Sequence, residues 1–362
     1  MKKHLIIEKV CKNREHNGFI KSYLRFYQEG RFSFYGNKHL AKNVLDDKKY
    51  RRYKGEADYT EILKLVLRNE VDITFLSANI PIVIFSILLS SFSNVKSIRI
   101  IPHAILNQIY FDSIDTSPKG WVKKLIPFIR FGFWIKYATK FKKIKVVVLG
   151  KSICENFSRI TGIDKIFWIH HPYDLSLPSK NEVVTEGESE RELKIGFVGI
   201  GSKDKGFFDL VEFLQQHQTK AKVKFYHIGP TSDKKESAYC NLVPVFNSST
   251  LVERELFEEK IRAMDYIILP LPNDEYKLRA SGSFFDAIKY EKPIIYTKND
   301  FVHSYIKGNE ALGIEFDIKN GKMDELYNLI ISSDRSKYAS NMANLKLELF
   351  EKMKSGTVHD YN

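Results

Sequence analysis

The chain has 362 residues, of which 43% are hydrophobic and 28% are charged, a composition that fits a globular protein and excludes a low-complexity one. This length is too great for one ordinary core and predicts two domains of about 150 to 200 residues each. The chain has three widely spaced cysteines and no C-x-x-C pair, which excludes a disulfide scaffold and a zinc framework. The N-terminus is unlike a signal peptide, and together with the cysteines this favours a cytoplasmic protein.

The charge of the chain is unevenly distributed. Residues 1–170 contain 31 Lys and Arg against 14 Asp and Glu, a net charge of +17, whereas the remaining residues carry −4. We therefore expect an anionic partner for the N-terminal half.

Strand-like and helix-like stretches alternate through the N-terminal half. Residues 3–8, 31–36, 72–77, 97–103 and 145–150 are short apolar runs that predict buried strands, and residues 58–69 and 151–162 have the spacing of amphipathic helices. Buried strands separated by helices predict an α/β domain with a parallel sheet.

Residues 118–145 combine nine Lys and Arg with many aromatic side chains and contain no acidic residue. Such a segment suits the headgroup region of an anionic bilayer; it also fits a core helix followed by a solvated basic turn. No recognised nucleic-acid-binding module accompanies the segment, so we expect no nucleic-acid partner. The residues expected to face the membrane are Trp121, Lys123, Lys124, Arg130, Trp134 and Lys136.

Residues 80–92, "IPIVIFSILLSSF", are uncharged but too short to span a bilayer, which takes about 20 apolar residues. They predict a buried helix or a second membrane-facing element.

Residues 175–192 lose the periodic pattern and gain charge, Pro and Gly, which is typical of a linker. A second α/β unit follows, because strand-like stretches at 193–201, which runs into a glycine turn, and at 222–230, 265–272 and 292–297 are again separated by helix-like stretches. Two such domains about a hinge place ligands in the cleft between them, where the carboxyl ends of strands meet helix N-termini.

The segment "YKLRASGSFFDAIKYEKPIIY" predicts a loop, a helix starting near Ser281 and Gly282, and a strand. The N-terminus of a helix presents backbone N–H groups and a positive dipole, and Arg279 and Lys205 would add cations. The pattern therefore indicates a site for a diphosphate. It also fits an ordinary N-cap serine with a solvated arginine.

These motifs resemble those of GT-B glycosyltransferases, particularly family 4-like enzymes that use nucleotide sugars to build bacterial surface polysaccharides such as lipopolysaccharide, O-antigen and capsule. The similarity is clearest in "IGFVGIGSKDKGFFDLVEFL", "FYHIGP" and "RASGSFFDAIKYEKPII". It implies two Rossmann-like domains facing a cleft, and transfer of a hexose-type sugar to a lipid-linked glycan.

The resemblance also implies roles for individual residues. Lys205 and Arg279 would stabilise the leaving diphosphate, His103 would face the donor sugar, and Asp286 would bind the ribose hydroxyls. His103 fits a structural histidine equally well. The other donor-binding residues implied are Gly199, Gly201, Lys203, Gly229, Ser281 and Gly282.

The chain departs from the family pattern at two points. Ile200 stands where an Arg is usual, and Leu278 replaces the first of two glutamates eight positions apart, which leaves the stereochemical outcome open. No D-x-D motif occurs, so we expect neither a metal site nor a cofactor beyond the nucleotide-sugar substrate. His103, Asp112 and Asp115 are the candidates for a base that would accept the acceptor's proton.

The sequence thus predicts an acceptor-binding domain at 1–174, a linker at 175–192, a nucleotide-sugar-binding domain at 193–335, and a C-terminal helix and tail at 336–362. The enzyme would act at the inner face of the cell membrane as a peripheral protein. Two alternatives are a nucleotide-sugar epimerase of the same architecture and a catalytically degenerate relative that binds a membrane or a partner.

Overall fold

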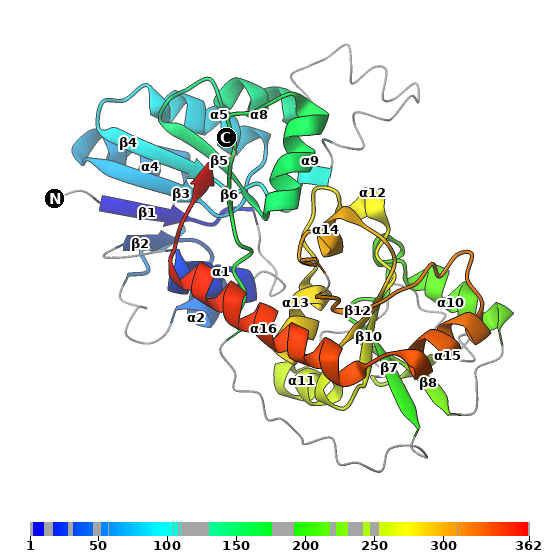
Figure 1. The fold of residues 1–362 in the computed structure, drawn as a ribbon. Coiled ribbons are helices and arrows are strands. Elements are labelled where there is room, and N and C mark those ends of the chain that lie inside the picture. The colour runs from blue at the N-terminus through cyan, green and yellow to red at the C-terminus, as the bar shows by residue number, and fades with distance from the viewer. Residues whose placement is uncertain are drawn as a thin grey trace. The chain divides into compact units, whose positions relative to one another are not determined.

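The computed structural model of the protein describes residues 3–10, 17–27, 32–45, 52–56, 58–103, 105–107, 109, 130–175, 192–217, 222–230, 242–246, 253–308 and 310–360. Two compact units make up the chain, each built on one sheet (Figure 1). The first unit comprises residues 1–174, 277–280 and 351–362, and the second comprises residues 175–276 and 281–350. The predicted linker lies almost entirely outside the described residues.

The first sheet has seven strands in the order β13-β6-β5-β4-β3-β1-β2. All pairings are parallel except that of β13, which runs antiparallel to β6. The predicted strands of the N-terminal half are confirmed, because their apolar residues are buried on both faces of the sheet. The strands are β1 (Lys3–Ile7), β2 (Phe32–Tyr35), β3 (Val71–Phe75), β4 (Val95–Ile100), β5 (Ile144–Leu149), β6 (Phe167–Ile169) and β13 (His359–Asp360).

Helices cover this sheet, and some of them begin at a residue whose side chain accepts a hydrogen bond from the first turn. Asp58 accepts a hydrogen bond from the Glu61 amide at 2.7 Å, and Asn79 accepts one from the Ile82 amide at 3.1 Å, so two helices begin where their cap residues predict. The helices are α1 (Asn17–Phe26), α2 (Lys38–Val44), α4 (Tyr59–Arg68), α5 (Ile80–Ser90), α8 (Phe131–Ala138) and α9 (Lys151–Thr161).

The second sheet has six parallel strands in the order β12-β11-β10-β7-β8-β9. The chain proceeds outward from β7 to β8 and β9, then returns to the other side of β7 with β10. The strand order therefore reverses between β7 and β10, the place where ligands bind in open α/β sheets. The strands are β7 (Leu193–Val198), β8 (Val223–Ile228), β9 (Leu242–Pro244), β10 (Tyr266–Leu269), β11 (Ile294–Tyr296) and β12 (Gly313–Glu315).

The helices of the second unit pack around this sheet, with Phe197, Phe207 and Leu326 among the side chains of its buried core. The last helix, α16, leads from this unit to β13 of the first. The helices are η4 (Lys203–Lys205), α10 (Phe207–Gln216), α11 (Arg254–Arg262), α12 (Asn273–Tyr276), α13 (Gly282–Lys289), α14 (Asp300–His303), α15 (Met323–Ser332) and α16 (Arg335–Lys354).

Candidate functional site

Two segments meet at the point where the order of the second sheet reverses: the turn after β7 and the first turn of α13. Gly199 follows β7 with φ at +101°, a conformation that favours glycine. A Cβ placed on Gly199 would lie 2.6 Å from Nζ of Lys205 and 3.3 Å from Oγ of Ser283. The lysine ammonium and the start of α13 therefore both lie against the backbone of this glycine.

The turn after β7 is held in place by the end of β8. The Gly199 amide donates to the Ile228 carbonyl at 2.8 Å, and a Cβ on Gly229 would lie only 2.1 Å from the Gly199 carbonyl oxygen. His227 is buried, and its Nε2 lies 3.0 Å from the same carbonyl, so Nε2 carries the proton and donates. The buried imidazole thus fixes the turn that faces the site.

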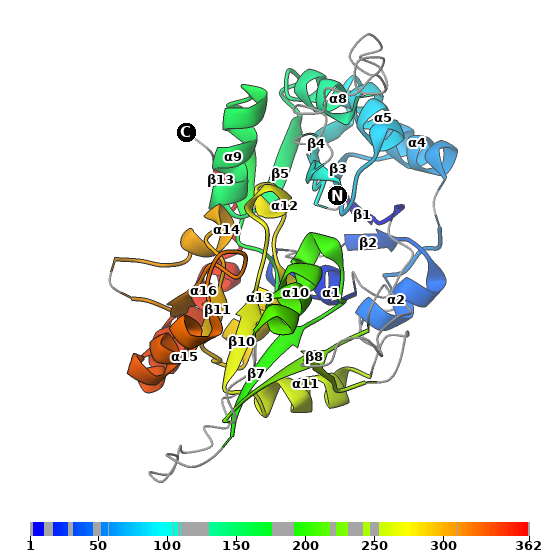
Figure 2. The ribbon, with the colours of Figure 1, turned by 90° about the vertical axis from the view of Figure 1, so that its right-hand side faces the viewer.

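The first turn of α13 is tied directly to β7. Ser281 caps the helix, since its Oγ accepts from the Phe284 amide at 3.3 Å, and Ser283 Oγ donates to the Val198 carbonyl at 2.6 Å. Gly282 is exposed, and a Cβ built on it would meet nothing within 4 Å. The first N–H groups of a helix have no acceptor inside the helix, so this end can receive an anion beside Lys205. Figure 2 shows α13 alongside β10.

Other predicted residues of the donor site lie around this turn. The Gly201 amide donates to the Pro230 carbonyl at 2.8 Å, and Lys203 is exposed at the start of η4. Arg279 is half-buried in segment 277–280, which belongs to the first unit; Asn156 of α9 donates to the Lys277 carbonyl of that segment at 3.1 Å. The structure thus groups Gly199, Lys205 and the first turn of α13, while Arg279 precedes Ser281 by two residues.

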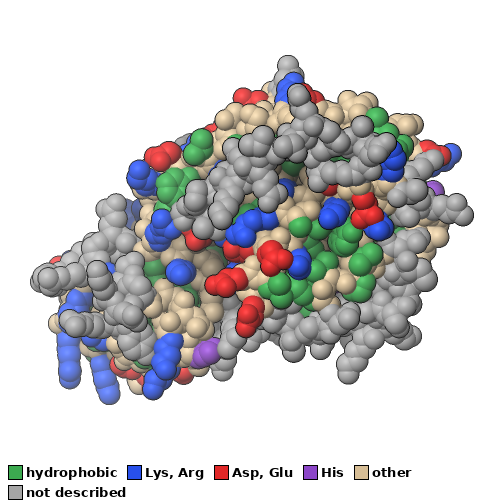
Figure 3. Space-filling model, turned by 90° about the horizontal axis from the view of Figure 1, so that it is seen from below, with side chains coloured by type: hydrophobic (Ala, Val, Ile, Leu, Met, Phe, Trp, Pro, Cys, Tyr) green, Lys and Arg blue, Asp and Glu red, His purple; other side chains and the backbone are tan. Residues whose placement is uncertain are grey.

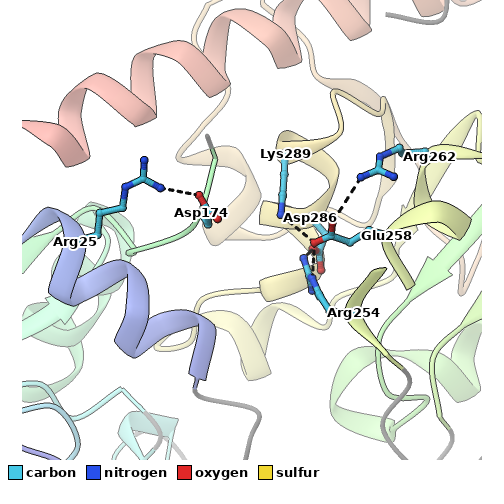
Figure 4. Close-up of polar contacts among 7 residues, drawn as sticks. All are labelled: Arg25, Asp174, Arg254, Glu258, Arg262, Asp286 and Lys289. Atoms are coloured by element: carbon cyan, nitrogen blue, oxygen red, sulfur yellow. Dashed lines mark hydrogen bonds and ion pairs between the residues drawn. The ribbon is translucent and has the colours of Figure 1, made fainter. Parts of the chain in front are cut away.

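Asp286 lies one turn further along α13 and belongs to an ionic cluster with α11 (Figure 4). Its carboxylate lies 2.7 Å from Nη2 of Arg254, whose Nε lies 2.7 Å from Glu258. Lys289, itself buried, contacts Glu258 at 3.0 Å. Burial raises the pKa of Glu258, but polar interactions that include the hydrogen bonds from Arg254 and Lys289 outweigh it and lower the pKa to about 2.

His103 follows β4 in the first unit and packs against Phe19, with the ring centroids 4.4 Å apart. The ring centroid of His171 also lies near Phe19, at 6.0 Å, and burial lowers the pKa of His171 to about 4. Glu8, directly after β1, is also buried and accepts hydrogen bonds from Ser77 and from the Val10 amide. Polar side chains therefore follow β1, β3, β4 and β6 at the carboxyl edge of the first sheet.

Sequence reasoning missed Ser283, His227, Arg254 and Glu8. Only Glu8 had a local signal, an acidic residue placed directly after a buried apolar strand. Asp112, Asp115, Trp121, Lys123 and Lys124 lie outside the described residues.

The described part of the basic aromatic segment is α8, preceded by Arg130. Phe131, Ile135 and Ala138 are buried, whereas Phe133, Lys136 and Tyr137 are exposed and Trp134 is half-buried. The helix thus has the buried face of a core helix and an exposed face that is both aromatic and basic.

No protein-family model and no curated protein matches the chain. Solved structures do resemble it over nearly its whole length. Anabaena HepE in complex with UDP aligns with a TM-score of 0.65 at 12% identity over 98% of both chains. The lipopolysaccharide outer core galactosyltransferase WaaB aligns with a TM-score of 0.60 at 12% identity, covering 98% of this chain and 99% of that one. Sucrose-phosphate synthase of Thermosynechococcus elongatus aligns with a TM-score of 0.58 at 11% identity, covering 98% and 95%. The chain therefore has the GT-B fold that its sequence motifs predicted.

Proposed function

We propose that the protein is a glycosyltransferase that moves a hexose-type sugar from a nucleotide-sugar donor to a lipid-linked oligosaccharide or polysaccharide. The observation that carries the proposal is the convergence of Gly199, Lys205 and the N-terminus of α13 where the second sheet reverses its order. Glycine backbone, a cation and helix N–H groups suit a diphosphate, because each offers a hydrogen bond or a positive charge to its oxygens.

The similar structures support this donor class. HepE was solved with UDP and with UDP-glucose, and WaaB is described as a galactosyltransferase of the lipopolysaccharide outer core.

In the proposed reaction, the bond between the anomeric carbon and the diphosphate oxygen breaks, and the acceptor oxygen bonds to that carbon. The negative charge developing on the diphosphate is stabilised by Lys205, Arg279 and the first N–H groups of α13. Asp286 accepts hydrogen bonds from the ribose hydroxyls. The acceptor hydroxyl gives up its proton to a base. Of the three candidate bases, His103 is the one that lies among the described residues.

We place the enzyme at the inner face of the cell membrane as a peripheral protein, where lipid-linked acceptors are available. The support is the basic aromatic segment at 118–145, which has no acidic residue. Among the helices that the structure describes, none is both long and apolar enough to cross a bilayer.

Two measurements test the proposed function. A thermal-shift screen of UDP, GDP and dTDP sugars should raise the melting temperature with at least one donor, because a ligand that binds only the folded state stabilises it. With that donor radiolabelled, transfer to membrane lipid extracts should then be measured. Donor binding without hydrolysis or transfer would favour a degenerate relative, and conversion of the free donor to another nucleotide sugar would favour an epimerase.

A further inference from the structure

Helix α5 exposes an apolar stripe. Pro81, Ile84 and Leu88 recur at helical spacing on its outer face; Ile84 is 40% exposed and Leu88 is 53% exposed. The opposite face buries Ile82, Val83, Ser86 and Leu89 against the first unit. The helix contains no charged residue, so its outer face differs from the usual solvent-facing side of a surface helix, which is polar.

The two neighbouring helices extend this apolar surface. Strands β3, β4 and β5 are adjacent and parallel, and the chain visits them in this order. Helix α5 connects β3 to β4, and α8 lies in the connection from β4 to β5. Because such connections are right-handed, both helices lie on the same face of the sheet. Figures 1 and 2 show α5 beside α8, and the two helices pack together. Helix α4 packs against α5 from the other side.

Each neighbour contributes large exposed side chains. Phe133 of α8 is 40% exposed and Tyr137 is 42% exposed, with their rings stacked at a centroid distance of 6.5 Å. Leu67 of α4 is 57% exposed, and the Asn94 side chain, just after α5, donates to its carbonyl at 3.3 Å. Five large apolar side chains on three adjoining helices therefore face outward, more than the scattered single residues of an ordinary surface.

Cations flank this surface on α8 and directly after it. Lys136, Lys140 and Lys142 are exposed, and Nζ of Lys140 lies 5.5 Å from the ring centroid of Tyr137. Neither α5 nor α8 contains an acidic residue. By contrast, acidic and basic side chains are interspersed on the face shown in Figure 3. The apolar side chains of α5 and α8, two helices without acidic residues, lie beside cations and so complement the acyl chains and phosphates of an anionic lipid surface.

We propose that α5 and α8 form a membrane-docking surface, in which Ile84 and Leu88 enter the acyl-chain boundary while Lys136 and Lys140 contact lipid phosphates. This inference rests on the peripheral location in the proposed function and extends it, because it assigns the apolar part of the attachment to α5, outside the basic aromatic segment. Vesicle binding is measured without glycosyl transfer, so the two results are independent. Vesicle binding can be lost while glycosyl transfer is demonstrated, and vesicle binding can be found in a protein that transfers no sugar.

The experiment is co-sedimentation of the full chain with vesicles of phosphatidylglycerol and phosphatidylcholine, and with phosphatidylcholine alone. Because the double variant removes two apolar side chains that would leave water on docking, Ile84→Ser with Leu88→Ser should lower the vesicle partition coefficient by roughly tenfold or more at both low and high salt. Lys136→Ser with Lys140→Ser should lower it mainly at low salt, since salt screens exposed charges.

Leu347→Ser provides the matched control, because Leu347 is a leucine of α16 that is also exposed, at 65%. The Leu347→Ser variant should sediment with vesicles like the parent protein. A second measurement uses variants that still bind vesicles. Brominated lipid should quench the tryptophan fluorescence of the Leu88→Trp variant more strongly than that of the Leu347→Trp variant. The proposal is overturned if the α5 variant sediments like the parent, if quenching is equal, or if α5 substitutions abolish self-association of the chain and leave vesicle binding intact.

Discussion

Arg254 and Asp286 lie on different helices, α11 and α13, yet the guanidinium and the carboxylate are only 2.7 Å apart (Figure 4). The Asp286 side chain is 8% exposed, whereas that of Arg254 is 51% exposed. A buried carboxylate without a partner is costly. The Arg254 guanidinium therefore offsets this cost and orients the Asp286 carboxylate one turn beyond the proposed diphosphate site.

Removing this arginine should weaken the recognition of ribose. We expect Arg254→Met to lower the preference of the protein for UDP over 2′-deoxy-UDP by about tenfold, because a hydrogen bond to a charged group contributes roughly 1.5–3 kcal/mol. Calorimetry with both nucleotides measures this. Arg262→Met is the control, since Arg262 contacts Glu258 in the same cluster. An unchanged preference in Arg254→Met would show that Arg254 does not position Asp286.

Lys205 and Arg279, the two cations assigned to the proposed diphosphate site, should act on the leaving group. Lys205→Ala and Arg279→Ala are each expected to reduce turnover by on the order of 100-fold, because each removes charge stabilisation of the departing diphosphate. The measurement is the rate at saturating donor, with melting temperatures to verify folding. Lys222→Ala, an exposed lysine just before β8, should keep the parent rate. Near-full activity in both site variants would refute the diphosphate site.

The tight turn after β7 should depend on Gly229. A Cβ there would overlap the Gly199 carbonyl oxygen, so Gly229→Ala is expected to lower the free energy of unfolding by more than about 2 kcal/mol. Urea denaturation measures the loss. Gly18→Ala places its Cβ in open space on α1 and should change stability by less than about 1 kcal/mol. Equal unfolding midpoints for Gly229→Ala and the parent would contradict this description of the turn.

Donor binding is expected to require no divalent metal, since the chain has no D-x-D motif and Lys205 and Arg279 would supply the positive charge. The rate of transfer should persist in EDTA, within about twofold of the untreated rate. Full inactivation by EDTA that Mg²⁺ or Mn²⁺ reverses would mean that a metal ion holds the diphosphate.

Mild acid should destabilise the protein through His171. Its pKa in the folded state is about 4 because of burial, whereas an exposed histidine has a pKa near 6.5. Between these values the unfolded chain binds the extra proton, so folding stability falls as the pH decreases from 6.5 towards 4, by about 3 kcal/mol in all. Chemical denaturation across this range should give a shallower pH dependence for His171→Gln. Identical slopes for the variant and the parent would exclude His171 as the source.

The strands and helix α13 could be predicted because their signals are local. A run such as residues 266–269 is apolar throughout and becomes β10, and Ser281 precedes α13 as a cap residue should. The helix start expected near Ser281 and Gly282 is confirmed; Ser281 is its N-cap, as the alternative interpretation held, and Gly282 is exposed at the helix start.

The residues that hold the candidate site together could not be predicted in this way. His227 lies inside an ordinary strand pattern, and only the pairing of β7 with β8 brings it to the Gly199 carbonyl. Arg254 and Asp286 are far apart in sequence, and they meet because the fold brings α11, which contacts β8, to α13, which contacts β10. Such contacts depend on tertiary packing, for which a single sequence carries no periodic signal.

The antiparallel pairing of β13 with β6 has a consequence for biosynthesis. On the ribosome the chain emerges from its N-terminus, so β6 is made before the entire second sheet, while β13 follows α16. Until β13 arrives, the outer backbone groups of β6 form an uncovered sheet edge, which can pair with other chains. The two residues that pair with Phe167 and Trp168 at this edge therefore reach the sheet only after the whole second sheet has been made.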